Sequence, residues 1–145
     1  LFVGARTTTQ VRGNRYGVFY EAVPYGSVPE TTTWIYGLQQ NSENRSNLGI
    51  VNTGEFNEQT SVFRIEIYDG ETGLLASTIE DITAEARKLI QIDSILEQFA
   101  PGIRQGYARI SRIIGTNPFL AFAVINDGGQ PGERTGDGTF IYSVP

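Results

Sequence analysis

The feature that most constrains the fold is a two-residue hydrophobic period that recurs along most of the chain. Segment 61–69 is the clearest case, because three apolar side chains alternate with three that carry polar groups. Such alternation predicts a β-strand with one face in a core and the other toward solvent. Segments 47–52 and 74–80 flank it across turn-forming residues, and this spacing is typical of a β-sandwich. The alternating residues are Phe63, Ile65 and Ile67 on one face and Arg64, Glu66 and Tyr68 on the other.

Two segments depart from simple alternation. Residues 119–125 are apolar throughout, which predicts a central strand covered on both faces. In residues 94–99, Ser94 and Glu97 have the spacing of a capping box before a stop at Pro101 and Gly102, so we expect a short helix that acts as a lid over the sandwich. The predicted fold class is therefore all-β, an antiparallel immunoglobulin-like β-sandwich with one short helix near residues 94–99.

A strand-turn-strand pattern occurs twice, about a hundred residues apart by direct reading of the chain. The early copy covers residues 5–38 and the late copy residues 108–144. If the late copy closes a domain, residues 1–38 are the C-terminal hairpin and last strand of a preceding repeat, or extra strands for assembly. Residues 39–145 are then one complete β-sandwich repeat. The alternative is that two hairpins of an all-β chain simply look alike.

Composition argues against several classes of function. The chain has no Cys and no His, so disulfides, thiolate metal sites and imidazole catalysis are not available, and we predict that it is not an enzyme. The net charge of −5 comes without a basic cluster, so nucleic acid and anionic membranes are poor partners. No apolar run reaches the ~18 residues that a membrane helix needs. A start at Leu1 without any Met suggests a processed product.

One loop has the composition of a cation site. Asp127, Glu133 and Asp137 lie in a Gly-rich segment at 127–139, and carboxylate oxygens are the ligands that calcium prefers. The alternative is an ordinary long turn, because Gly and Pro are what such a turn requires and Arg134 can neutralise a carboxylate. Beyond this possible calcium, we expect no cofactor.

Residues 45–52 read Arg-Ser-Asn-Leu-Gly-Ile-Val-Asn, and they follow a Tyr-Gly pair at 36–37. With the loop at 127–139 and the strand at 139–144, this run resembles an immunoglobulin-like β-sandwich repeat of large secreted bacterial surface proteins. The resemblance implies an extracellular or cell-surface module without catalytic residues. From the residues alone, we expect Leu48 and Ile50 to enter the core and Arg45 to pair with an acidic loop residue.

Two non-enzymatic functions remain. The first is a structural or adhesive module that contacts copies of itself or neighbouring repeats, and that could form a surface fibre by strand pairing. The expected interaction face for this assembly carries Val18, Tyr20, Ile35 and Trp34. The alternative is a glycan-binding accessory domain that uses exposed aromatic residues, because Trp34, Tyr36 and Tyr20, together with Tyr16 and Tyr25, crowd the N-terminal third.

Overall fold

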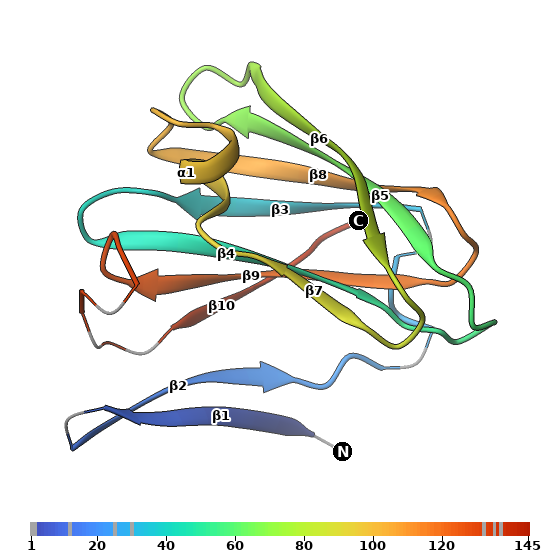
Figure 1. Ribbon diagram of the computed structural model, residues 1–145, viewed down its shortest axis with the longest axis horizontal. Helices are drawn as coiled ribbons and strands as arrows, with labels where there is room; N and C mark the ends of the chain where they lie inside the picture. Colours follow the sequence, from blue (N-terminus) through green and yellow to red (C-terminus); the bar gives the residue numbers. More distant parts are fainter. Residues whose placement is uncertain are drawn as a thin grey trace.

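The computed structural model describes residues 3–11, 13–24, 26–29, 31–131, 133, 134, 136 and 138–145. It is an all-β antiparallel sandwich with one short helix, which confirms the predicted fold class. Figure 1 shows three layers, with a β-hairpin below two packed sheets. The hairpin consists of β1 (Gly4–Val11) and β2 (Asn14–Glu21).

Each sheet of the sandwich has four strands and combines segments that are far apart in the sequence. The middle layer is the sheet β10-β9-β4-β7, with β10 (Thr139–Tyr142), β9 (Phe119–Asp127), β4 (Asn44–Asn52) and β7 (Leu89–Ile92). The other outer layer is the sheet β3-β8-β5-β6, with β3 (Thr32–Gln39), β8 (Gln105–Ile114), β5 (Ser61–Asp69) and β6 (Leu75–Ala84).

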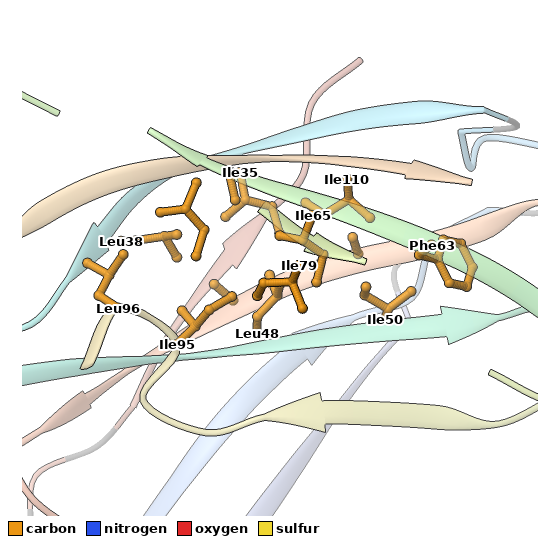
Figure 2. Packing of buried hydrophobic residues seen from close by; sticks show 14 of the residues in the cluster. Ile35, Leu38, Leu48, Ile50, Phe63, Ile65, Ile79, Ile95, Leu96 and Ile110 are labelled. Atoms are coloured by element: carbon orange, nitrogen blue, oxygen red, sulfur yellow. The ribbon is translucent and has the colours of Figure 1, made fainter. Parts of the chain in front are cut away.

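The core lies between the two four-stranded sheets and is built from the inward residues of the alternating strands. Figure 2 shows these side chains meeting from both sheets. Phe63 of β5 contacts Phe119 of β9 with ring centroids 4.9 Å apart, and both side chains are fully buried. Burial of a side chain of this size contributes about 1.5–3 kcal/mol. Leu48 and Ile50 enter the core as predicted.

The predicted helix is α1 (Ile95–Phe99), and it closes one end of the sandwich over β4 and β6. Ile95 and Leu96 are fully buried and Phe99 packs against the core, so the expected lid is confirmed. The predicted capping box does not form. Ser94 has a φ of 44° and makes no side-chain cap bond, because its N–H is turned to donate to Asn47 Oδ1 at 3.0 Å.

The run at 45–52 forms most of β4, and its polar side chains tie neighbouring segments together. Asn52 donates to two backbone carbonyls, while Ser46 Oγ accepts from the backbone N–H of Gln39 at 2.7 Å. Gly49 leaves room for the Phe122 ring, since a Cβ there would lie 2.4 Å from it. The prediction that Arg45 pairs with an acidic loop residue is wrong. Its guanidinium donates instead to the backbone carbonyls of three loop residues, Asp127, Gly128 and Gln130.

The hairpin packs on the outer face of the sheet β10-β9-β4-β7. Tyr20 of β2 makes edge contacts with Phe122 and Phe140, at centroid distances of 6.4 and 5.1 Å. The backbone N–H of Glu21 donates to the hydroxyl of Tyr142 at 3.1 Å. Strand β9 therefore has the core on one side and the hairpin on the other, which confirms the prediction of a central strand covered on both faces.

Strand β3 belongs to the sandwich, although its residues fall within the segment 1–38 that the sequence assigned to a preceding repeat. It pairs with β8 along its length, from Thr32 opposite Ser111 to Gln39 opposite Gln105. On its other edge, Trp34 exchanges two backbone hydrogen bonds of 2.8 Å with Val144. The sandwich thus contains residues 32–39, and within the described residues the hairpin of β1 and β2 precedes it.

Candidate functional site

The outer face of the sheet β3-β8-β5-β6 carries a group of aromatic side chains that we call the platform. Its members are Trp34 and Tyr36 of β3, Tyr107 of β8 and Tyr68 of β5. The antiparallel register brings them together, because Trp34 lies opposite Arg109 and Tyr68 lies opposite Tyr107. Residues that are distant in sequence therefore form one surface that crosses three strands.

The rings of the platform contact one another closely. Tyr68 and Tyr107 are stacked, with centroids 5.1 Å apart and an interplanar angle of 5°. Tyr107 also stacks on Tyr36 at 5.4 Å and 27°. The Trp34 ring lies within 6.2 Å of Tyr36, Tyr68 and Tyr107. Aromatic contacts of this kind add about 0.5–1.5 kcal/mol each beyond the burial of area, so the platform is held in one arrangement.

A β-bulge turns Leu38 into the core, while Tyr36 keeps the outward position that its alternation with Ile35 gives it. Residues two apart in a regular strand share a face, so Tyr36 and Leu38 would otherwise point the same way. The register shifts between Ile35 and Leu38, and Gly37 adopts a φ of 82°, which a residue without Cβ tolerates. As a result Leu38 returns to the core, while Tyr36 stays on the surface with 52% of its area exposed.

Two ion pairs flank the rings. Arg109 lies 5.7 Å from the centre of the Trp34 ring and contacts Glu66 Oε2 at 3.2 Å. Arg64 donates from Nε to both carboxylate oxygens of Glu80 at 2.8 Å. The hydrogen bond and the attraction of Glu80 raise the pKa of the Arg64 guanidinium above its ordinary value. The two positive charges beside the platform are therefore balanced by carboxylates.

The platform also presents polar groups toward solvent. Within the described residues, protein hydrogen bonds reach the hydroxyls of Tyr20 and Tyr142, but none reaches those of Tyr36, Tyr68 and Tyr107. The site thus combines apolar ring surface with three phenol groups that can each donate and accept a hydrogen bond.

The structure separates the interaction residues expected from the sequence. Trp34 and Tyr36 belong to the platform. Val18 and Tyr20 are half-buried in the hairpin, on the opposite side of the molecule, where Tyr20 covers Phe122 and Phe140. The prediction that Ile35 lies on the interaction face is wrong. Its side chain is fully buried in the core, because it alternates with Trp34 and Tyr36 along β3. The side chain of Tyr16 and the whole of Tyr25 lie outside the described residues.

The sequence did not predict that Tyr68, Tyr107 and the ion pair of Arg109 with Glu66 belong to the site. The alternation in residues 61–69 already placed Glu66 and Tyr68 on the solvent face, and Glu66 does point away from the core. The missing signal was the pairing of β5 and β3 with β8, which joins positions about 40 and 70 residues apart.

The acidic loop after β9 has the hydrogen bonds of a turn. Asp127 Oδ2 accepts from the N–H of Gly136 at 2.9 Å, and Glu133 Oε2 accepts from the N–H of Gln130 at 3.0 Å. Asp137 lies outside the described residues, and among those that are described no three acidic side chains meet in a possible metal site. Calcium binding by this loop stays a prediction.

No family model matches the chain, and no curated protein or solved structure gives a significant match. In the part of the chain that the structure describes, no helix has the length and apolar character needed to cross a membrane.

Proposed function

We propose that the chain is a non-catalytic extracellular module with a structural or adhesive function, and that the platform is its contact surface. The observation that carries the proposal is the cluster of one Trp, three Tyr and one Arg on a single solvent-facing sheet surface. Trp, Tyr and Arg are the residues most enriched where binding energy concentrates in protein contact surfaces. The extracellular setting is supported by the sequence resemblance described above.

The chemistry around the platform supports binding rather than catalysis. The two carboxylates beside the rings, Glu66 and Glu80, are each bound to an arginine. Glycoside hydrolysis needs two carboxylates facing each other across a substrate, one of them with a raised pKa. The chain has no His or Cys that could serve as an alternative base or nucleophile.

A bead-adhesion experiment tests this function. Beads that carry the wild-type chain are passed over surfaces coated with the chain itself, with extracellular matrix proteins or with insoluble polysaccharides. We expect retention on at least one surface, and we expect Trp34→Ala and Tyr107→Ala to lose it. Phe56→Ala is the matched control, because Phe56 is a similarly exposed aromatic residue outside the platform (58% exposed). Beads that adhere to none of the surfaces would contradict the proposal.

Assembly into a fibre by strand pairing is a second candidate, and the hairpin favours it. In the described sheets, β1 and β2 pair only with each other, and an isolated two-stranded sheet is a ready template for a further strand. Light scattering over a wide range of protein concentration tests this assembly. Growing polymers would support it, whereas a monomer at every concentration would contradict it.

A further inference from the structure

We propose that the platform binds a neutral polysaccharide, laid as an extended chain across the strands of the sheet β3-β8-β5-β6. This inference rests on the proposed adhesive function and names the chemical class of its ligand. It is carried by the shape of the platform, by its charge balance and by its polar groups.

The apolar surface of the platform has the shape of a strip. The row Tyr36–Tyr107–Tyr68 continues onto β6, where the register places Leu75 opposite Tyr68, and Leu75 is 52% exposed. The row crosses all four strands, so it is about 15 Å long at ~4.8 Å per strand spacing. None of these rings lines any of the three cavities described in the structure. A strip on an open sheet face suits a polymer better than a small molecule, which requires a concave site.

The area of the platform is small. The platform has two rows of side chains, and residues two apart along a strand are separated by about 7 Å. The strip therefore covers on the order of 100–200 Å², even when the rings reach beyond their backbone positions. The strip alone is smaller than the about 800 Å² on each side that a stable protein interface needs, so a protein partner would have to contact the surrounding sheet face as well. A single polysaccharide chain needs only the strip.

The charges beside the platform are paired. Arg109 is balanced by Glu66 and Arg64 by Glu80, so neither guanidinium is left to attract an anion. The chain as a whole carries a net charge of −5, which repels anionic polymers. A ligand without charge is the one that this surface admits without a desolvation penalty for an unpaired ion.

The platform can also form hydrogen bonds with a sugar. The C–H faces of a sugar ring are apolar and its hydroxyls both donate and accept, and the platform offers the same combination. The three phenol hydroxyls of Tyr36, Tyr68 and Tyr107 have no protein partner within the described residues. Thr32 and Ser111 add two more hydroxyls, 3.2 Å apart, at the end of the platform next to Trp34.

Affinity electrophoresis tests the inference. The wild-type chain is run through native gels that contain hydroxyethyl cellulose, mixed-linkage β-glucan, xyloglucan or galactomannan as neutral polymers. Gels with alginate and polygalacturonate serve as the anionic arm. We expect retardation by at least one neutral polymer and none by the anionic ones.

Variants then locate the binding surface. Tyr36→Ala should weaken the apparent affinity about tenfold, which corresponds to the loss of one or two aromatic contacts. Tyr36→Phe, which removes only the hydroxyl, should show a smaller loss, and the control Phe56→Ala should bind like the wild type. Because Tyr36 lies on an edge strand and is half exposed, its replacement leaves the core intact.

The outcomes separate this inference from the function on which it rests. One outcome would overturn polysaccharide binding and leave the adhesive function standing. In that outcome adhesion depends on the platform but occurs only on protein-coated surfaces, and no neutral polymer retards the chain. Retardation by neutral polymers that Tyr36→Ala does not alter would also overturn it. A chain that shows neither adhesion nor retardation would overturn both.

Discussion

Both outer faces of the sandwich carry an aromatic cluster, but only one of them is covered in the described structure. On the sheet β10-β9-β4-β7, Phe122 and Phe140 lie beneath Tyr20 of the hairpin. On the sheet β3-β8-β5-β6, the platform faces solvent in the part of the chain that the structure describes. The difference follows from the residue types, because Phe rings have no polar group, whereas phenol hydroxyls can be left in water.

The residue types on the two outer sheet faces determine which face is covered and which stays exposed. The outward positions of β9 include Leu120, Phe122 and Val124, which gain only from being buried. The outward positions of β8 include Tyr107, Arg109 and Ser111, whose polar ends remain hydrated while their apolar parts pack together.

The largest expected effect comes from removing the covered ring. Phe122 is only 8% exposed, so Phe122→Ala should lower the free energy of unfolding by about 3–4 kcal/mol through lost burial and an unfilled cavity. Urea unfolding measures the change. The same variant should let trypsin cleave faster after Arg15 in the hairpin, and an unchanged cleavage rate would mean that Phe122 does not hold the hairpin in place.

Removing the covering ring should have a somewhat smaller effect. Tyr20→Ala deletes two edge contacts and uncovers Phe122 and Phe140, for which we expect a loss of about 2 kcal/mol. Hydrogen exchange measured by mass spectrometry should show faster exchange in β1 and β2 while β5 and β8 keep their protection. Loss of protection throughout the molecule would show that the hairpin and the sandwich unfold as one unit.

On the uncovered face, the expected loss of stability is smaller again. Tyr107→Ala removes the ring that stacks between Tyr36 and Tyr68, and we expect a cost of about 1–1.5 kcal/mol because the site is already partly hydrated. Thermal unfolding by circular dichroism checks this value. A loss as large as that of Phe122→Ala would mean that the two faces do not differ, and that the platform serves the fold rather than contact.

The smallest effect is expected at the ion pair. Glu66→Gln leaves Arg109 without its carboxylate, and since Arg109 is substantially exposed the cost should stay below about 1 kcal/mol and shrink as salt is added. The functional change should be larger than the structural one, because the unbalanced guanidinium should allow retardation by alginate in the native gels. Unchanged behaviour toward alginate would show that the ion pair does not set the charge preference of the surface.

Local patterns in the sequence were sufficient for the strands, the core and the helix. The alternation of Phe63, Ile65 and Ile67 identified the buried face of β5, and the unbroken apolar run of β9 required a cover on its second face. The identity of that cover, Tyr20, could not be read locally, because it depends on where the chain folds back. Ser94 shows a related limit, since its capping pattern was overruled by the hydrogen bond to Asn47.

The platform could be predicted only in part, because it is a product of strand pairing. Trp34 and Tyr36 drew attention as neighbours in sequence, but Tyr68 and Tyr107 join them only through the register of β5 and β8. The bulge at Gly37 had a further effect, since it places Leu38 in the core although Tyr36, two residues earlier, lies on the surface.

The bridge between Trp34 and Val144 has a mechanical consequence. The strands are antiparallel there, so residues 32 and 145 lie next to each other at the same end of the sandwich. A pulling force applied at these two points would load this one pair first, so the bridge would open before the longer pairing of β3 with β8 is strained.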